Sequence, residues 1–335
     1  MKIIVDQAIP YIKDRIPDEV ETVYMAGNAI TEKEVKDAVA MVIRTRTLCN
    51  ESLLKDSTVK LVATATIGTD HIDIPWCEKN GIMVKSAPGC NAPGVAQYVL
   101  SSLMRAGFDR RHHTLGIIGY GNVGSTVADW AKQIGIRVKI SDPPRKDSGH
   151  TDAEYLEMKE LLSTCEALTL HVPLTDSGLY PTNKMIGKEE LSMMSRGTIL
   201  INSSRGGVVD EESLKEKLRE GGIKAVVDVW ENEPEIDPEL VDLAFIATPH
   251  IAGYSEEGKK RGTRMALQAL EDILGVNVNI KGLECIPPVG RSVTRELIEG
   301  SYNPLDDTRK LKSAVSDFEF LRNNYNYRHE PLFMQ

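Results

Sequence analysis

Short apolar runs alternate with polar, helix-prone stretches along the first part of the chain. The runs are the length of β-strands and cover residues 2–6, 20–25, 39–44, 60–66 and 82–86. Strands that are apolar along their whole length and alternate with helices predict a parallel sheet covered on both faces. Five such strands predict a domain of the flavodoxin-like type.

A second series of strand and helix patterns begins at Thr114. Its six apolar runs give the number of strands in a full dinucleotide-binding sheet, and they read TLGIIG, IRVKIS, ALTLHV, GTILIN, KAVVDV and FIATP. Residues 91–108 predict a helix that leads into this domain, with Asn91 as its cap and Pro93 in its first turn. Residues 255–274 predict a long helix that returns to the first domain.

The fold class is therefore α/β, with two doubly wound parallel-sheet domains. We expect a flavodoxin-like domain at residues 1–92 and 255–282, and a Rossmann domain at residues 93–254. The periodic pattern decays after about Gly282, so residues 283–335 predict a short C-terminal appendage.

A glycine-rich loop follows the first strand of the second series. Gly119, Gly121 and Gly124 form G-x-G-x-x-G between that strand and a helix pattern that begins with Asn122 and Val123. The glycines permit a tight turn, close approach of the backbone to a pyrophosphate, and packing of helix on strand. The helix N-terminus adds amide donors and the positive end of its dipole.

Asp142 ends the next strand at the distance expected of the acid that binds a ribose. Its carboxylate can accept hydrogen bonds from the ribose diol and would repel a 2′-phosphate, which favours NAD over NADP. Arg145, three residues further on, is the one observation that points the other way. Pro143 and Pro144 also fit a simpler interpretation, in which Asp142 only initiates a turn.

Three polar residues follow the carboxyl ends of later strands, where ligands bind in open α/β sheets. They are Arg205 after GTILIN, Glu233 after KAVVDV and His250 after FIATP. Oxidation of an alcohol needs a base, for which imidazole is suited, and a carboxylate can orient that ring. A guanidinium can bind a substrate carboxylate. We therefore predict His250 as the acid/base, Glu233 as its partner and Arg205 as the substrate clamp.

The composition of the chain argues against two classes of binding partner. The 335 residues are 41% hydrophobic and 27% charged, with a net charge of −9 and no cluster of Lys and Arg, which argues against nucleic acid or a membrane surface. No apolar stretch is long enough for a membrane span or a signal peptide, so we expect a cytoplasmic protein. Five scattered cysteines without a C-x-x-C pair or a His cluster predict reduced thiols and no metal site.

The segments GIIGYGNVG, SSRGGVVD, DVWENEP and TPHIAGY resemble the D-isomer-specific 2-hydroxyacid dehydrogenases, in order over about residues 1–280. Within that superfamily the chain is most similar to the erythronate-4-phosphate dehydrogenase family, through ATATIGTDHID, SAPGCNAPGVAQYV, DPPR and HIAGYSEEGKKRGT. The resemblance implies NAD-dependent oxidation of 4-phospho-D-erythronate to (R)-3-hydroxy-2-oxo-4-phosphooxybutanoate, a step of pyridoxine 5′-phosphate biosynthesis.

The resemblance also assigns roles to residues. It implies catalytic roles for Arg205, Glu233 and His250, NAD contacts for Asp142, Asp228 and Gly253 beside the glycine loop, and substrate contacts for Thr45, Thr66 and Tyr254. A phosphorylated substrate needs cations, and Arg44 and Arg46 in VIRTR are our candidates, although a solvated loop is an equal alternative. The family has a C-terminal dimerisation domain, so the short region 283–335 implies a homodimer.

Two alternatives remain. One is another enzyme of the same superfamily, a 3-phosphoglycerate dehydrogenase or a hydroxypyruvate/glyoxylate reductase. The other is an NAD-sensing binding protein without catalysis. The complete set Arg205, Glu233 and His250 favours an enzyme.

Overall fold

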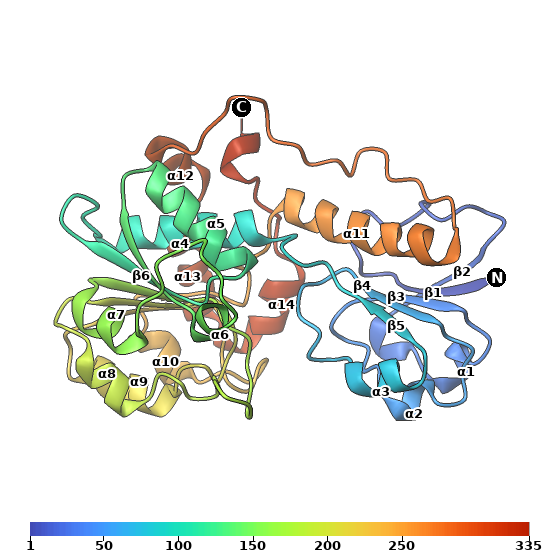
Figure 1. The fold of residues 1–335 in the computed structure, drawn as a ribbon, viewed down its shortest axis with the longest axis horizontal. Helices are drawn as coiled ribbons and strands as arrows, with labels where there is room; N and C mark the ends of the chain where they lie inside the picture. The colour runs from blue at the N-terminus through green and yellow to red at the C-terminus, as the bar shows by residue number, and fades with distance from the viewer. Residues whose placement is uncertain (335) are drawn as a thin grey trace. The chain divides into compact units, whose positions relative to one another are not determined.

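The computed structural model describes residues 1–334, which form two compact units (Figure 1). Unit 1 contains Met1–Asn91 and Glu256–Ile286, and unit 2 contains Ala92–Ser255 and Pro287–Gln335. The chain crosses between the units after Asn91, after Ser255 and after Ile286. Its C-terminal segment belongs to unit 2 and does not form a unit of its own.

Unit 1 is built on a parallel sheet of five strands in the order β2-β1-β3-β4-β5. The strands are β1 (Lys2–Asp6), β2 (Glu21–Met25), β3 (Ala40–Ile43), β4 (Leu61–Thr64) and β5 (Met83–Lys85). The helices are η1 (Gly27–Ala29), α1 (Glu32–Val35), α2 (Glu51–Leu54), α3 (Ile74–Lys79) and α11 (Glu256–Leu274). This strand order is that of a flavodoxin-like fold, which confirms the predicted class.

Both faces of this sheet are buried, and successive residues of one strand serve different faces. Ile3 and Val5 of β1 pack in a core with Leu267 and Leu270 of α11, whereas Ile4 packs in a second core with Leu54 of α2. Figure 1 shows α11 along one face and α1, α2 and α3 along the other. Strands that alternate between two apolar faces have no polar side, which explains their continuous apolar runs.

Unit 2 contains a parallel sheet of six strands in the order β11-β10-β9-β8-β6-β7. The strands are β6 (Thr114–Ile118), β7 (Arg137–Ser141), β8 (Ala167–Leu170), β9 (Ile199–Asn202), β10 (Lys224–Val227) and β11 (Ile246–Ala247). After β7 the chain crosses to the other side of β6, so the strand order reverses between β6 and β8. Ligands bind at such a point in Rossmann folds, outside the carboxyl ends of the strands.

One strand of the usual dinucleotide-binding sheet is reduced to a single bridge. Tyr155 pairs with Ile140 of β7, on the side of β7 away from β6 in strand order. Residues 148–157 otherwise lack a strand. The sheet thus keeps the Rossmann order with its outer strand shortened to this contact, and the predicted fold class is confirmed.

Helices cover both faces of the sheet of unit 2. They are α4 (Ala92–Ala106), α5 (Asn122–Gln133), α6 (Pro143–Asp147), α7 (Met158–Thr164), α8 (Lys188–Met193), α9 (Glu211–Arg219) and α10 (Pro238–Leu243). Ile117 packs in the core that contains α4 and α5, whereas Ile118 packs with α7, α8 and α10. No helix within residues 1–334 has both the length and the apolar character needed to cross a membrane.

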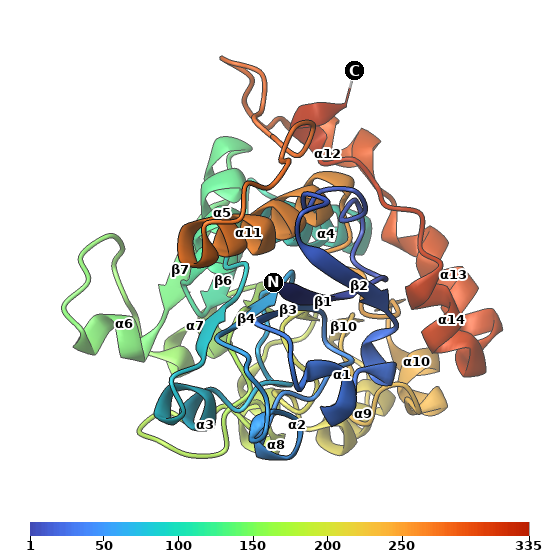
Figure 2. The same ribbon diagram turned by 90° about the vertical axis from the view of Figure 1, so that its right-hand side faces the viewer.

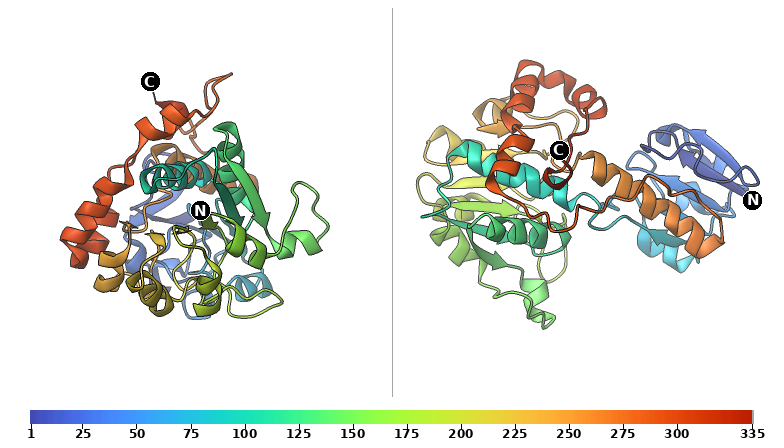
Figure 3. Two further views of the ribbon diagram at one scale, coloured as in Figure 1. Left: turned by 90° about the vertical axis from the view of Figure 1, so that its left-hand side faces the viewer. Right: turned by 90° about the horizontal axis from the view of Figure 1, so that it is seen from above.

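The C-terminal segment adds further helices to unit 2. They are α12 (Arg295–Ser301), α13 (Pro304–Ser313), η2 (Val315–Asp317), α14 (Phe318–Asn323) and η3 (Pro331–Phe333). Figures 2 and 3 show them, in orange to red, along one side of unit 2, where α13 contacts α10. Ile298 and Tyr302 extend one core of unit 2, and Leu311 and Phe318 extend the other.

Candidate active site

The loop between β6 and α5 has two positions that only glycine can occupy. Gly119 has φ +90°, and a Cβ atom there would lie 2.5 Å from the carbonyl oxygen of His171. A Cβ atom at Gly124 would lie 2.0 Å from the carbonyl oxygen of Gly119. Both positions therefore require glycine, the first for its backbone conformation and its contact, the second for close packing of α5 on the loop.

Gly121 is different, because a Cβ atom there would meet nothing within 4 Å. The loop is open at this position, where a pyrophosphate would approach the backbone. Gly121 is the N-cap of α5 and supplies no side-chain cap to the helix. The amides of Asn122 and Val123 thus lie in the first turn of a twelve-residue helix, at the positive end of its dipole. These residues fit the phosphates of a dinucleotide.

Asp142 links the end of β7 to this loop. Its Oδ2 accepts a hydrogen bond of 2.7 Å from the amide of Tyr120, and its Oδ1 accepts one of 3.0 Å from the amide of Arg145. The second bond caps α6, so the turn-forming interpretation also holds. The guanidinium of Arg145 donates to Asp152 at 2.7 Å and to the hydroxyl of Tyr155. The positive charge of Arg145, which could have bound the 2′-phosphate of NADP, is thus neutralised by the Asp152 carboxylate. This arrangement favours NAD.

His250 and Glu233 form a hydrogen-bonded pair at the carboxyl ends of β11 and β10. His250 Nδ1 lies 2.8 Å from Glu233 Oε2 and 3.0 Å from Oε1. The amide of Trp230 donates to Glu233 Oε1 at 3.1 Å, and the indole Nε1 of Trp230 donates to the carbonyl of Thr248. Trp230 therefore joins the loop that carries Glu233 to the loop that carries His250.

The electrostatics keep Glu233 ionised although its side chain is only 18% exposed. Burial raises the pKa of Glu233. The hydrogen bond and charge of His250, the charge of Arg322 and the Trp230 amide outweigh burial and bring this pKa below its ordinary value. An ionised carboxylate only accepts hydrogen bonds, so Nδ1 of His250 carries a proton both in the charged ring, which contributes to the lowered pKa of Glu233, and in the neutral ring. The other ring nitrogen, Nε2, is then the basic atom.

Arg205 lies on the loop after β9, the strand next to β10 in the sheet. Its Nη1 donates to the carbonyl of Ser204 at 2.8 Å, and its own carbonyl accepts from the side-chain amide of Asn202. A Cβ atom at Gly206 would lie 1.9 Å from the carbonyl oxygen of Trp230. This glycine packs the Arg205 loop directly against the Glu233 loop, so the three predicted catalytic residues stand on adjoining loops.

Asp228 holds the loop that follows His250. Its Oδ1 accepts from the Thr248 hydroxyl at 2.7 Å and from the amide of Ile251 at 2.8 Å, and its Oδ2 accepts from the amide of Ala252 at 2.9 Å. Burial raises the pKa of Asp228 against these stabilising contacts. His250 itself has φ +56°, in the left-handed region that is uncommon for non-glycine residues. The anchored loop keeps the imidazole in this conformation.

Gly253 and Tyr254 follow directly on this loop. The amide of Tyr254 donates to the carbonyl of Ile251 at 2.8 Å, and the carbonyl of Gly253 accepts from the amide of Ser255. The backbone thus turns at the predicted NAD contact Gly253 and the predicted substrate contact Tyr254. Contacts of Asp228, Gly253 and Tyr254 with ligands stay predictions.

The other predicted substrate residues belong to unit 1, at the carboxyl ends of β3 and β4. Arg44 is half-buried and its Nη1 donates to the carbonyl of Ala8 at 2.8 Å, whereas Thr45 and Arg46 are exposed. The hydroxyl of Thr66 lies 2.7 Å from that of Thr64 and bonds the carbonyl of Gly68. Two cations and two hydroxyls thus lie at one edge of the unit 1 sheet.

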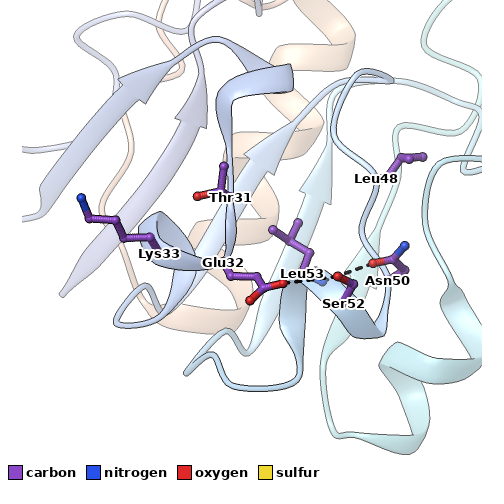
Figure 4. A pocket seen from close by; sticks show the side chains of 7 residues that line it. All are labelled: Thr31, Glu32, Lys33, Leu48, Asn50, Ser52 and Leu53. Carbon is purple, nitrogen blue, oxygen red and sulfur yellow. Dashed lines mark hydrogen bonds between the residues drawn. The ribbon is translucent and has the colours of Figure 1, made fainter.

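Unit 1 also has a surface hollow of about 570 Å³ near α1 and α2. It is lined by Thr31, Glu32, Lys33, Leu48, Asn50, Ser52 and Leu53. Figure 4 shows the Glu32 carboxylate turned towards the Ser52 hydroxyl, and the two lie 3.3 Å apart. None of the predicted substrate residues lines this hollow, and we assign it no function.

Two arginines of the C-terminal segment contact the catalytic loops, and neither was predicted from the sequence. Arg322 Nη1 donates to Glu233 Oε2, and Arg322 Nε donates to the hydroxyl of Tyr254, both at 3.3 Å. Arg328 is 9% exposed and donates to the carbonyls of Ile251, Ala252 and Tyr254. The only signal was the likeness of FLRNNYNYRHE to part of a dimerisation domain, which suggested a different role.

Comparison with known proteins places these residues in a family. Residues 97–252 match the model of the D-isomer specific 2-hydroxyacid dehydrogenase NAD binding domain. A protein of Bacteroides fragilis named erythronate-4-phosphate dehydrogenase is 42% identical, with 98% of this chain and 97% of that protein aligned. The protein of the same name from Escherichia coli O157:H7 is 37% identical over 98% of this chain and 92% of its own length.

A solved structure supports the same placement. The NAD-bound 3-phosphoglycerate dehydrogenase of Entamoeba histolytica is 27% identical, with a TM-score of 0.66 over 88% of this chain and 99% of that one. The likeness to the two erythronate-4-phosphate dehydrogenases spans both units and includes the C-terminal segment. The chain therefore belongs to the erythronate-4-phosphate dehydrogenase family of D-isomer-specific 2-hydroxyacid dehydrogenases.

Proposed function

We propose that this chain is the NAD-dependent dehydrogenase that oxidises 4-phospho-D-erythronate to (R)-3-hydroxy-2-oxo-4-phosphooxybutanoate in pyridoxine 5′-phosphate biosynthesis. The observation that carries the proposal is the pair of His250 and Glu233, joined at 2.8 Å on loops after neighbouring strands of a dinucleotide-binding sheet. Relatives of this name at 37–42% identity over nearly the whole chain support the substrate.

NAD fits the loop between β6 and α5. Gly119, Gly121 and Gly124 leave the backbone accessible, the first turn of α5 offers amides, and Asp142 stands at the end of the next strand. When bound, NAD supplies the acceptor for the hydride that leaves C2 of the substrate.

The substrate's hydroxyl proton goes to His250. As hydride departs from C2, Nε2 of His250 accepts the proton of the C2 hydroxyl, and the C–O bond becomes a carbonyl. The imidazolium that forms is stabilised by Glu233, which already accepts the Nδ1 proton. We assign Arg205 to the substrate carboxylate, where a guanidinium also polarises the oxygen on C2. A positioned general base contributes about 10²- to 10⁴-fold to such a step.

The remaining substrate groups fall to the other predicted residues. We propose that Arg44 and Arg46 bind the phosphate and that Thr45, Thr66 and Tyr254 bind the hydroxyls. Arg44 is the stronger candidate of the two cations, because it is half-buried whereas Arg46 is exposed. We also propose that the protein is cytoplasmic and forms a homodimer through residues 283–335. Light scattering of the purified chain tests whether it is a dimer.

A side-by-side assay tests the function. Purified protein with NAD is given 4-phospho-D-erythronate, 3-phosphoglycerate, and, in the reverse direction with NADH, hydroxypyruvate and glyoxylate. The proposal expects kcat/KM for 4-phospho-D-erythronate to exceed that for 3-phosphoglycerate by at least about tenfold, or about 1.4 kcal/mol. Preference for 3-phosphoglycerate or hydroxypyruvate would reassign the substrate. NAD binding with no turnover of any of them would indicate a binding protein.

A further inference from the structure

The end of the chain lies against the catalytic loops of its own unit. Phe318, the first residue of α14, is 1% exposed and packs in a core of unit 2, which fixes this short helix. Figure 2 shows α14 beside α13 on the side of unit 2. Arg322, one turn after Phe318, therefore projects from a fixed base.

Arg322 reaches two residues of the site. Its Nη1 lies 3.3 Å from Glu233 Oε2, the oxygen that His250 also bonds, and its Nε lies 3.3 Å from the Tyr254 hydroxyl. The arginine side chain is only 26% exposed. Burial lowers the pKa of Arg322, but Tyr254 and Glu233 reverse this and raise it, so the guanidinium stays charged.

The ion pair with Arg322 balances the negative charge of Glu233 at the stage of the reaction when His250 is neutral. Glu233 is buried and ionised, whereas His250 is neutral before proton transfer and positive after it. A buried carboxylate without a cation costs several kcal/mol and tends to take up a proton. Arg322 supplies that cation while His250 is neutral. A protonated Glu233 would no longer be a pure acceptor for His250 Nδ1, and the basic tautomer would be lost.

We propose that Arg322 is a positioning residue for the reaction: it keeps Glu233 ionised and aimed at His250, so the C-terminal segment completes the active site of its own subunit. This inference rests on the proposed function. It adds a third member to the predicted pair and gives the segment a role besides dimerisation.

Aromatic and polar contacts hold Tyr254, to whose hydroxyl Arg322 donates. The ring of Tyr254 meets those of Tyr325 and Tyr327 edge-on, each with centroids 6.1 Å apart. Tyr325 donates to Asp307 at 3.3 Å and accepts from Arg328 Nη1 at 3.3 Å. Tyr254, the hydroxyl partner of Arg322, is therefore packed against side chains from the same C-terminal segment.

The experiment uses the full-length enzyme and the variants Arg322→Gln, Arg322→Lys and Arg322→Ala. The matched control is Arg309→Gln, which removes an exposed arginine of α13 that pairs only with Asp306 among the described residues. The substrate is whichever D-2-hydroxy acid the wild type oxidises fastest, so an error in the assigned substrate leaves this test intact. A wild type that oxidises none ends the proposed function and this inference with it.

We expect kcat of Arg322→Gln to fall by about 10- to 100-fold, with KM and the Kd of NAD within about threefold of wild type, because misplaced catalytic groups slow the chemical step. A deuterium label at C2 of the substrate should give a larger isotope effect on kcat in this variant. Arg322→Lys should recover part of kcat, and added guanidinium should restore part of it to Arg322→Ala. Arg309→Gln should match wild type.

Two results would overturn the inference. One is an unchanged kcat with a raised KM, which would make Arg322 a substrate-binding group. The other is a kcat that falls only in parallel with the folded fraction, measured by thermal unfolding, with no change in isotope effect. If the Gln and Ala variants do not fold, Arg322→Lys decides, since it keeps the charge but changes the geometry. A lowered kcat with an unchanged KM and a larger isotope effect would support positioning, whereas an unchanged kcat with a raised KM would refute it.

Discussion

The loops of unit 2 that carry His250 and Glu233 differ sharply from the edge of unit 1 that carries Arg44 and Thr45. In unit 2 the amides after His250 are held by Asp228 and the carbonyls by Arg328. In unit 1, Arg44 donates to the carbonyl of Ala8, and Thr45 is exposed. Proton transfer needs atoms placed in advance, whereas recognition of a charged substrate tolerates side chains that settle around it.

Loss of the base should have the largest effect. His250→Ala removes the atom that receives the hydroxyl proton, so we expect kcat to fall by about 10²- to 10⁴-fold. The Kd of NAD, measured by fluorescence quenching, should change little because the glycine loop is untouched. A variant that keeps near wild-type turnover would show that His250 is not the base.

Loss of the loop anchor should come next. Arg328 donates to the carbonyls of Gly94, Ile251 and Ala252 and lies over the ring of Tyr302. Replacing it with Met leaves buried carbonyls without donors, and we expect a loss of about 3–5 kcal/mol in the free energy of unfolding by urea.

The exposed arginine Arg309 again serves as the control for this prediction. Its ion pair with Asp306 lies at the surface, so Arg309→Met should cost less than about 1 kcal/mol. Equal unfolding curves for the two variants would show that Arg328 does not anchor the loop.

A smaller and different effect is expected at the edge of unit 1. Arg44→Ala should raise KM for 4-phospho-D-erythronate by about 10- to 100-fold, the worth of a charged hydrogen bond, with kcat within about threefold. Lys33→Ala, which removes a cation from the surface hollow instead, should change neither value. A loss confined to kcat would place Arg44 in the chemical step and remove the contrast between the regions.

The smallest effect concerns Glu211, a partly buried carboxyl group beside the loop that carries Glu233. Glu211 Oε1 accepts from the amide of Glu231 at 2.7 Å, and burial raises the pKa of Glu211 to about 7. The folded protein thus holds this proton to higher pH than the unfolded chain does, so stability declines as pH rises from about 4.5 to about 7. Above that range the ionised group is destabilising.

Glu211→Gln keeps an acceptor for the amide and removes the charge. We expect it to be more stable than wild type at pH 8 by about 1 kcal/mol, after allowance for screening by solvent, and equal to it at pH 4. Thermal unfolding at both pH values measures the difference. A variant that is less stable than wild type at pH 8 would contradict the raised pKa.

The strands of both units were predictable because they are buried on both faces. β1 lies at Lys2–Asp6 as its apolar run indicates, and β6 at Thr114–Ile118. The predicted catalytic residues followed from topology, since parallel strands bring their carboxyl ends to one edge. Local patterns thus sufficed to predict that these residues lie on adjoining loops, and their catalytic roles stay predictions.

Arg322 was not predictable in this way. It lies on a six-residue helix in a polar segment, and its partner Glu233 is 89 positions earlier in the chain. Nothing in periodicity or spacing reports such a contact, because it depends on how the C-terminal segment folds back onto unit 2. The dual use of Asp142, which caps α6 and also bonds the glycine loop, was likewise visible only in three dimensions.

The most direct test of the division between the two regions is a discrimination ratio. It compares kcat/KM for 4-phospho-D-erythronate with that for unphosphorylated D-erythronate in wild type, Glu233→Gln and Arg44→Ala. We expect Glu233→Gln to slow both substrates alike and to preserve the ratio, whereas Arg44→Ala should lower the ratio by about tenfold or more. A ratio that collapses in Glu233→Gln and survives in Arg44→Ala would contradict this division.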